Sequence, residues 1–467
     1  MSVSDSPLVA SNPRWTVYDA RTVRKIPQLE SLDPDLVDDI ELAARVFPFK
    51  VNDYVLQELI DWSDPLRDPI FRLVFPRSAM LPEIWRERLR VMVTAKAPLH
   101  LMDREIREIR LQMNPDPSGQ ATNVPVVGDN HLQGIQHKYP DTVLAFPAQG
   151  QTCHSYCSFC FRWPQFTDGV VPRHELRDVQ ALHEYLRLHG EVSDLLITGG
   201  DPFVMSARRL RDLMLPLLSP ELSHVRTIRI GTKALTYWPF RILNGDGAAL
   251  LDAIRELSNA GKQVAIMAHV NHWREMEPEP FRDAVRALRD AGAVIRTQSP
   301  ILRGINDAAL IWQRTWADQL TLGMVPYYMF VERDTGAAPY FQLPLARALS
   351  LYQSAVSGLS GLARTARGPV MSTSAGKLHV VGTLEMGSDK YFVLNFLRAR
   401  EQTMVDRPFL AHFDEEAVWV NDLRPAPGFE HFLPESLLYD DPSGHTAGSR
   451  VLPGKDPDGV MRSAAAL

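Results

Sequence analysis

Along the central part of the chain, short apolar runs alternate with amphipathic segments, and this alternation limits the possible folds. Six apolar runs of strand length begin at Val143, Asp194, Val225, Gln263, Ala293 and Met324. The segments between them, such as AALLDAIRELSNAG and PFRDAVRALRDAG, have helical spacing, and several end in glycine. Alternating strands and helices require a mainly parallel sheet covered by helices. An α/β fold is therefore predicted, and six units suit a partial (β/α)6 TIM-type barrel as well as an open doubly wound sheet; we favour the barrel.

The regions on either side of this alternation have other patterns. Residues 1–135 are expected to form an N-terminal helical cap, because runs such as LVDDIELAARVF and IWRERLRVMVTA have helical spacing. Residues 136–342 form the barrel. Residues 343–467 form a C-terminal extension, with a helix over 343–356 and two short strand-like pieces, KLHVVG and KYFVLNF. A tail rich in Pro, Gly and Asp follows from about residue 421, and we expect it to wrap the surface or a partner subunit.

Length and charge exclude several classes of protein. A chain of 467 residues can bury a large core, so a single small module is excluded. With 50 basic and 56 acidic residues the net charge is -6, which argues against a nucleic-acid partner. The N-terminal stretch MSVSDSPLVASNPRW lacks the features of a secretory signal, and no apolar run reaches membrane-spanning length. A soluble, cytoplasmic protein without a membrane partner is expected.

The three cysteines of the chain all lie within eight residues, in the sequence Cys-His-Ser-Tyr-Cys-Ser-Phe-Cys from Cys153 through Cys157 to Cys160. This clustering suits metal binding better than disulfide formation. Three thiolates can hold three irons of a [4Fe-4S] cube and leave the fourth iron open, whereas electron-transfer clusters usually have a cysteine on every iron. The alternatives are a zinc site completed by His154 or another histidine, and three unliganded cysteines. The spacing favours the cluster.

A second motif, Gly199-Gly200-Asp201-Pro202, follows the second predicted strand. Two adjacent glycines let the backbone approach a ligand closely. Taken alone, the motif is equally typical of a tight turn.

A cysteine loop of this spacing after the first strand, followed by GGDP after the second, resembles the radical S-adenosylmethionine (SAM) superfamily. The resemblance implies that SAM chelates the open iron and that Gly199, Gly200, Asp201 and Pro202 receive its methionine amino group. It also implies reductive cleavage of SAM to a 5′-deoxyadenosyl radical, with an external electron donor such as flavodoxin or ferredoxin. The substrate is then a small molecule.

Further segments narrow the resemblance to the lysine 2,3-aminomutase family over roughly residues 135–400. They are YPDTVL at Tyr139, Phe161-Arg162, IRIGTKA at Ile228, AHVNH at Ala268, QSPILRGIND at Gln298 and PYYMF at Pro326. All except YPDTVL lie at or just after the C-terminal end of a predicted strand, where a barrel builds its active site. The family resemblance implies pyridoxal phosphate held on a lysine, and a homo-oligomer.

Individual roles follow from the resemblance. Lys377, in the small-residue loop Ser-Thr-Ser-Ala-Gly-Lys, matches the lysine that carries pyridoxal phosphate; the alternative is a surface-loop lysine. Lys138 and Thr142 stand where the family has two arginines that meet the cofactor phosphate, which weakens this site. Tyr139 from the same stretch and Tyr327 are further pyridoxal phosphate candidates. The SAM candidates besides GGDP are Lys233, His269 and Gln298.

The substrate positions depart from the family. Lysine-acting members place two aspartates around the distal ammonium, and Arg333 and Val370 stand there in this chain. Neither can pair with an ammonium ion, although Asp334 is one residue away, so we infer a substrate other than lysine. Arg162 matches the arginine that binds the substrate carboxylate. Arg333 could bind a second acidic group, as in a glutamate-like substrate, or form a salt bridge at the rim.

Three functions remain open from the sequence. The first is a 2,3-aminomutase that moves nitrogen from Cα to Cβ of an amino acid bound to pyridoxal phosphate. The second is a radical SAM enzyme without pyridoxal phosphate that oxidises, epimerises or rearranges a small carboxylate substrate. The third, a cluster-bearing sensor, is disfavoured because an open iron beside GGDP is suited to catalysis.

Overall fold

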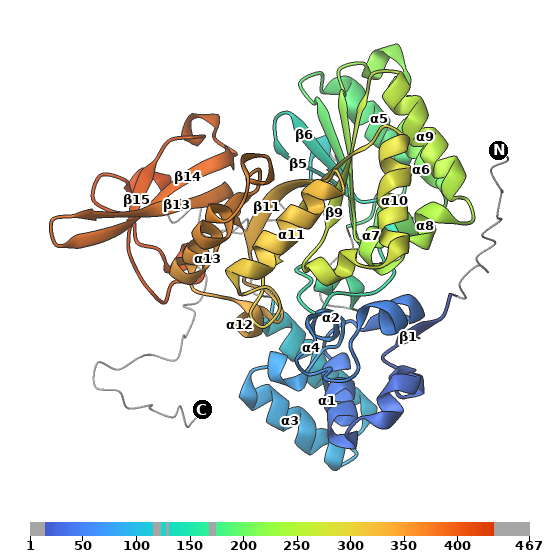
Figure 1. The fold of residues 1–467 in the computed structure, drawn as a ribbon, viewed down its shortest axis with the longest axis vertical. Helices are drawn as coiled ribbons and strands as arrows, with labels where there is room; N and C mark the ends of the chain where they lie inside the picture. Colours follow the sequence, from blue (N-terminus) through green and yellow to red (C-terminus); the bar gives the residue numbers. More distant parts are fainter. Residues whose placement is uncertain (1–14, 115–122, 128–129, 168–173, 434–467) are drawn as a thin grey trace, which may run out of the picture.

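The computed structural model of the protein describes residues 15–114, 123–127, 130–167 and 174–433. In Figure 1 a helical N-terminal unit, drawn in blue, lies at one end of a central α/β body, and an orange antiparallel sheet extends from the side of that body. The predicted tail is described only as far as residue 433, and Leu423, Phe432 and Leu433 are buried against the orange sheet of their own chain. Its remainder lies outside the described residues.

One sheet of eleven strands runs through the described part of the chain, in the order β15-β14-β13-β12-β11-β10-β9-β8-β7-β6-β5. Its strands are β5 (Ile135–Tyr139), β6 (Thr142–Ala145), β7 (Asp194–Ile197), β8 (Thr227–Thr232), β9 (Gln263–His269), β10 (Val294–Ile301), β11 (Val325–Val331), β12 (Arg367–Ser372), β13 (Gly376–Met386), β14 (Asp389–Ala399) and β15 (Phe409–His412). The six predicted strands correspond to β6 through β11 and pair in parallel. The predicted α/β class and the partial barrel are confirmed.

Helices cover the outer face of the parallel strands (Figure 1). They are α5 (Val179–Leu188), α6 (Ala207–Met214), α7 (Ala234–Tyr237), α8 (Phe240–Leu243), α9 (Gly247–Asn259), α10 (Glu279–Asp290) and α11 (Ala309–Thr321). Helix α5 begins at Val179, where the Asp178 carboxylate accepts hydrogen bonds from the amides of Gln180 and Ala181.

The alternation of strand side chains separates the core from the site. In β8, Ile228 and Ile230 point outward into the largest buried apolar cluster, which they share with the covering helices. Each fully buried side chain of this kind contributes about 1.5–3 kcal/mol. Arg229 lies between them in sequence and therefore points to the opposite face. By the same alternation, Thr227 and Gly231 also lie on the inner face of β8.

The N-terminal unit contains α1 (Pro34–Ala44), α2 (Pro69–Val74), α3 (Glu83–Thr94), α4 (Leu99–Gln112) and a small antiparallel sheet of β1 (Val17–Asp19) and β2 (Lys50–Asn52). Its apolar core continues into the barrel, where it includes Phe159, Trp163, Leu302 and Phe341. Two short strands, β3 (Val126–Val127) and β4 (Asn130–His131), lead from it toward the barrel. The unit therefore packs directly on the residues around the cysteine loop.

The C-terminal extension is larger than the sequence indicated. After α12 (Ala338–Phe341) and α13 (Leu345–Ser357), β12 extends the barrel in parallel with β11, and β13, β14 and β15 continue antiparallel. The pieces KLHVVG and KYFVLNF belong to strands of 11 residues each. Lys377 is the second residue of β13, which corrects its predicted place in a loop.

Side chains also join the two ends of this sheet. Arg398 of β14 forms an ion pair with Asp141, between β5 and β6, and Lys138 of β5 donates a hydrogen bond to the backbone carbonyl of Thr373. The gap of the partial barrel is therefore bridged by charged groups.

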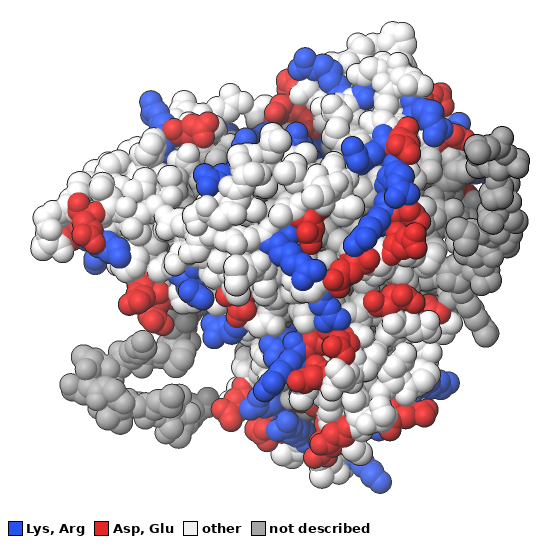
Figure 2. Space-filling model, viewed as in Figure 1, with Lys and Arg blue, Asp and Glu red and all other residues white. Residues whose placement is uncertain are grey.

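The outer surface mixes both signs of charge. In Figure 2, Lys and Arg lie among Asp and Glu over the face in view, most densely over the helices. No helix in the described residues has the length and apolar character needed to span a bilayer.

Candidate active site

The cysteine loop follows β6, and its three thiols are partly buried. Burial raises the pKa of all three, well above normal for Cys153, to about 11 for Cys157 and to about 12 for Cys160. Neighbouring cysteine thiols further disfavour the ionisation of Cys153 and Cys160. A positively charged metal centre would reverse both effects.

The arrangement of these thiols bears on which metal they suit. Among the described residues, no three His, Cys, Asp or Glu side chains converge as the ligands of a single ion would. A cube of four irons takes one thiolate per iron, so its ligands need not meet at one point. His154 is buried and lies 3.9 Å from Asp201, and burial lowers its pKa to about 3. The loop therefore fits a [4Fe-4S] cluster better than a zinc site completed by His154.

The N-terminal unit holds this loop in place. The amide of Tyr156 donates to the Lys50 carbonyl at 2.8 Å, and the amide of Ser158 donates to the Leu73 carbonyl at 2.8 Å. The amide of Asn52 donates to the Ser155 hydroxyl at 3.1 Å. No sequence pattern indicated these contacts, because the partners are far apart in the chain.

The two glycines of GGDP allow a close approach to the cysteine loop. The amides of Gly200 and Asp201 both donate to the Gly150 carbonyl at 3.0 Å. A Cβ on Gly200 would lie 2.4 Å from the Thr152 carbonyl oxygen, and Gly199 has φ +148°. The motif is therefore more than a turn, because it fixes the cysteine loop to the end of β7.

The Asp201 carboxylate connects β7 to β8. It accepts hydrogen bonds from the Thr232 hydroxyl at 2.7 Å and from the Lys233 amide at 2.9 Å. Burial raises its pKa to about 6. In this arrangement Asp201 positions the segment after β8, while the backbone of GGDP faces the cysteine loop.

Lys233, a predicted SAM contact, has protein partners. Its ammonium donates to Glu275 at 2.6 Å, to the Asn271 side chain at 2.9 Å and to the His269 carbonyl at 3.3 Å. All three donor positions of the ammonium are thus used within the fold. Glu275 and Asn271 are site residues that the sequence interpretation missed, although Asn271 lies in the quoted AHVNH segment.

Several buried polar atoms near the cysteines have no hydrogen-bond partner in the described structure. They include Nε2 of His269, and Nε and Nη2 of Arg162. The His269 ring lies 5.6 Å from the Phe159 ring of the cysteine loop, and the Arg162 guanidinium lies 4.2 Å from the Phe146 ring. Buried polar groups normally have partners, so these atoms fit a polar ligand such as SAM or a carboxylate substrate. Gln298 is paired with His269 in the sheet and is partly buried.

Lys377 lies on β13 and is partly buried. Burial lowers the pKa of its ammonium to about 7, and the nearby cations Arg333, Arg229 and Arg398 lower it further. The ammonium lies 5.0 Å from the Tyr328 ring and 4.6 Å from the Phe330 ring. A surface-loop lysine would have none of these neighbours.

The tyrosine ring beside Lys377 is that of Tyr328, a residue not singled out from the sequence, and the role of Tyr327 stays a prediction. Tyr327 instead lies under Arg296, whose guanidinium is 5.5 Å from its ring centroid. A register irregularity between Thr297 and Gln298 on the neighbouring strand shifts the pairing here. For this reason, the face of the sheet to which each side chain of β11 points could not be assigned from the sequence.

The predicted phosphate end lies around Tyr139. The Lys138 ammonium is 5.6 Å from the Tyr139 ring and the Arg398 guanidinium is 4.5 Å from it. Thr142 is buried, with its hydroxyl 3.4 Å from Nη2 of Arg398. Arg398 was not among the residues singled out from the sequence.

Arg333 and Val370 are the residues that the resemblance places where lysine-acting members have their substrate aspartates. The Arg333 guanidinium lies 4.3 Å from the Phe161 ring, and it influences the pKa of Lys377, Arg162 and Tyr139. Val370 is fully buried opposite Phe330. Arg162 and Arg333 are therefore two cations at one site. Asp334 is partly buried.

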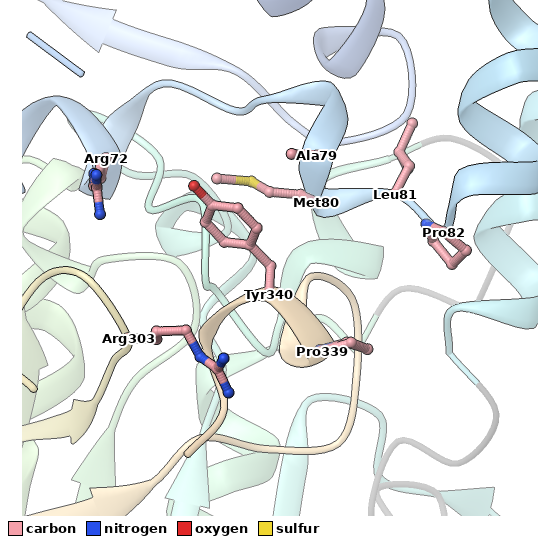
Figure 3. Close-up of a pocket in the computed structure, with 8 residues that line it drawn as sticks. All are labelled: Arg72, Ala79, Met80, Leu81, Pro82, Arg303, Pro339 and Tyr340. Atoms are coloured by element: carbon pink, nitrogen blue, oxygen red, sulfur yellow. The ribbon is translucent and has the colours of Figure 1, made fainter. Parts of the chain in front are cut away.

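A separate cavity of about 510 Å³ lies between the N-terminal unit and α12. Figure 3 shows Tyr340 reaching from α12 toward Met80, with Arg72 and Arg303 at the same cavity. Both arginines bond backbone carbonyls, Arg72 that of Gly304 and Arg303 that of Gln342. None of its lining residues belongs to the predicted site.

Comparison with known proteins gives the same family as the motifs. No family model matches the chain. A protein of Aquifex aeolicus (strain VF5), provisionally named L-lysine 2,3-aminomutase, is 30% identical over 410 residues, covering 87% of this chain and 94% of the relative. The L-lysine 2,3-aminomutase of Acetoanaerobium sticklandii is 28% identical over 255 residues, covering 54% of this chain and 57% of the relative.

Among solved structures, a radical SAM methyltransferase from Sphaerobacter thermophilus matches with a TM-score of 0.36 and 17% identity, over 51% of this chain and 68% of that one. The sequence match to the Aquifex aeolicus relative extends over most of both chains. The chain therefore belongs to the lysine 2,3-aminomutase family of radical SAM enzymes.

Proposed function

We propose that the protein is an aminomutase that carries pyridoxal phosphate on Lys377 and acts on an amino acid with a second carboxylate. The observation that carries the proposal is the environment of Lys377. Its lowered pKa of about 7 leaves much of the amine neutral near neutral pH, and a neutral amine is the form that attacks an aldehyde. Its charged neighbours are arginines, which suit the anionic groups of a cofactor and an acidic substrate.

The residues fit the groups that this chemistry needs. Cys153, Cys157 and Cys160 would hold the cluster, and the unpartnered atoms of His269 and Arg162 would meet SAM and the substrate carboxylate. When bound, the cluster and SAM supply a 5′-deoxyadenosyl radical, and pyridoxal phosphate supplies a ring that delocalises a radical next to nitrogen.

The side chains of the site then have distinct tasks. Arg162, stacked on Phe146, presents two buried N–H groups that orient the α-carboxylate. Arg333 orients the second carboxylate of the substrate. Phe159 and the stacked pair Tyr156 and Phe166, with ring centroids 4.8 Å apart, exclude water from the cysteine loop.

Lysine is a poor substrate for such a site. Its distal ammonium would approach the Arg333 guanidinium, and like charges at short range repel. Val370 has no group that accepts a hydrogen bond, and it is fully buried. A distal carboxylate is attracted to the same guanidinium.

A second candidate is a radical SAM enzyme that does not use pyridoxal phosphate. The observation in its favour is Thr142, a neutral residue where the family has an arginine, combined with Lys138, whose ammonium donates to the Thr373 carbonyl. The low pKa of Lys377 favours the first candidate.

The test uses anaerobically purified protein with its cluster reconstituted. Pyridoxal phosphate is added, the protein is treated with borohydride, and peptides are analysed by mass spectrometry for a pyridoxyl group. We expect the group on Lys377, and its loss in Lys377→Ala but not in Lys390→Ala, which changes an exposed lysine of β14. We also expect a β-amino product from glutamate, and none from lysine.

Each alternative result has one meaning. Reductive SAM cleavage without any pyridoxyl label would support the second candidate. A label on Lys377 together with turnover of lysine would refute the proposed substrate class and leave the cofactor assignment intact.

A further inference from the structure

Lys377 and Arg398 are directly paired across β13 and β14, so two cations face each other in the sheet. Like charges directly opposite each other destabilise antiparallel strands. Arg229, a third cation near Lys377, is paired with Asp194 at 2.7 Å. The site therefore holds more positive charge than its two aspartates, Asp141 and Asp194, can balance, and an anion bound here would relieve the excess.

Arg398 lies beside Thr142, the neutral residue at one of the two positions where the family has a phosphate-binding arginine. Its Nη2 forms an ion pair with Asp141 and lies 3.4 Å from the Thr142 hydroxyl. Its guanidinium is also 4.5 Å from the Tyr139 ring centroid, beside which Lys138 lies on β5. Arg398 comes from β14, far along the chain, yet its guanidinium is at the position predicted for the cofactor phosphate.

The Arg398 side chain has donors to spare. The described residues give its Nε and Nη1 no hydrogen-bond partner, because the hydrogen bonds of the guanidinium to the protein use Nη2. A guanidinium can bind a phosphate through two parallel N–H groups while it keeps a carboxylate on the third. Asp141 then orients the guanidinium and leaves its Nε and Nη1 available to a phosphate.

We propose that Arg398 binds the phosphate of the pyridoxal phosphate carried on Lys377, and so replaces the guanidinium that Thr142 does not provide. This inference rests on the proposed function. Lys138 and Arg398 together form the phosphate site, one from each end of the sheet. The cofactor thereby connects β5 and β6 to β13 and β14.

The competing explanation is structural, because the ion pair with Asp141 alone could serve to close the sheet. Two substitutions distinguish these roles. Arg398→Gln removes both the ion pair and the donors, whereas Asp141→Asn removes the ion pair and keeps the guanidinium. A structural role predicts that the two variants behave alike, and a phosphate-binding role predicts that they differ.

The experiment measures the dissociation constants of pyridoxal phosphate and of pyridoxal for the full-length protein by absorbance titration. For Arg398→Gln we expect pyridoxal phosphate to bind about 10- to 100-fold more weakly, the range for a lost charge-assisted hydrogen bond, with pyridoxal unchanged. Arg398→Lys should recover part of the loss. Asp141→Asn should keep the preference for the phosphorylated form, as should Lys390→Gln, which removes a cation from the exposed end of β14.

Other results would overturn the inference. Equal weakening of pyridoxal phosphate and pyridoxal in both Arg398→Gln and Asp141→Asn would mean a structural role. Unchanged binding in Arg398→Gln would exclude any role in the phosphate site. Failure of the unmodified protein to bind pyridoxal phosphate would refute the proposed function itself, and this result differs from all the others.

Discussion

The ammonium of Lys233 lies 2.6 Å from the carboxylate of Glu275, and both side chains are buried beside the cysteine loop. Glu275 also accepts hydrogen bonds from the amides of Asn271 and His272, so its charge is compensated from several sides. The pair connects the end of β8 to the segment after β9. It fixes the two segments between which the unpartnered His269 side chain lies.

Lys233→Met is expected to destabilise the protein, because it leaves the Glu275 carboxylate buried without a cation. Removing one partner of a buried pair costs about 3–5 kcal/mol. The double variant Lys233→Met, Glu275→Gln should recover a substantial part of this loss. Thermal unfolding of the three proteins measures both effects. A Lys233→Met protein of normal stability that fails to bind SAM would instead support the direct contact inferred from the family resemblance.

The amine of Lys377 should react at a much lower pH than an ordinary lysine. With its pKa lowered to about 7, it is half neutral near pH 7, whereas a lysine of unperturbed pKa is half neutral at about 10.4. Competitive labelling with an amine reagent across pH, analysed by mass spectrometry, checks this on the cofactor-free protein. Half-maximal labelling of Lys377 above pH 10 would contradict it.

The same shift makes stability depend on pH, with a definite sign. Between about pH 7 and pH 10.4 the unfolded chain binds a proton at Lys377 that the folded protein lacks, so stability rises with pH across this window. Lys377→Met should remove that part of the slope. Denaturant unfolding at several pH values, compared between the two proteins, measures it.

Gly200→Ala should impair cluster binding. The added methyl would lie 2.4 Å from the Thr152 carbonyl oxygen, so the cysteine loop must move. We expect iron content after anaerobic reconstitution to fall well below the unmodified protein. Gly382→Ala is the control, because a Cβ on Gly382 meets no atom within 4 Å. Full iron content in Gly200→Ala would show that the loop accommodates the methyl group.

Arg333→Gln should weaken the binding of a dicarboxylate amino acid about 10- to 100-fold, because it removes the charge proposed to hold the second carboxylate. Affinity for SAM should be unchanged, and Arg333→Lys should retain part of the binding. Arg347→Gln, on the exposed side of α13, controls for net charge. Equal binding of glutamate by Arg333→Gln and the unmodified protein would remove Arg333 from the substrate site.

The local patterns of the sequence were sufficient to predict the barrel and to single out the cysteine loop. The strands β6 to β11 each have an apolar run bounded by helical segments, and this period is visible without any knowledge of partners. The strands β12 and β15 were not predicted; each is defined by its pairing with a neighbour, β11 and β14, which the local sequence does not show. The sequence indicated only that the backbone at Gly200 could approach a ligand closely. Its close approach to the Thr152 backbone depends on the fold.

Residues that act across the sheet could not be predicted. Lys50, Asn52 and Arg398 reach the site from segments remote in sequence, and nothing in their local context distinguishes them from surface polar residues. Tyr328 was missed for another reason, because a register irregularity on the neighbouring strand alters the local alternation.

The bridging of the two ends of the sheet sets an order in which the sites can be completed during synthesis. The contacts of the cysteine loop use residues up to about the end of the barrel, whereas Lys138 and Asp141 must wait for Thr373 and Arg398. Since chains emerge from the ribosome N-terminus first, the iron site can form while the lysine-bearing strand is still unmade. A chain that stops before β13 would therefore keep the three cysteines and the GGDP motif and would lack Lys377, the residue proposed to carry pyridoxal phosphate.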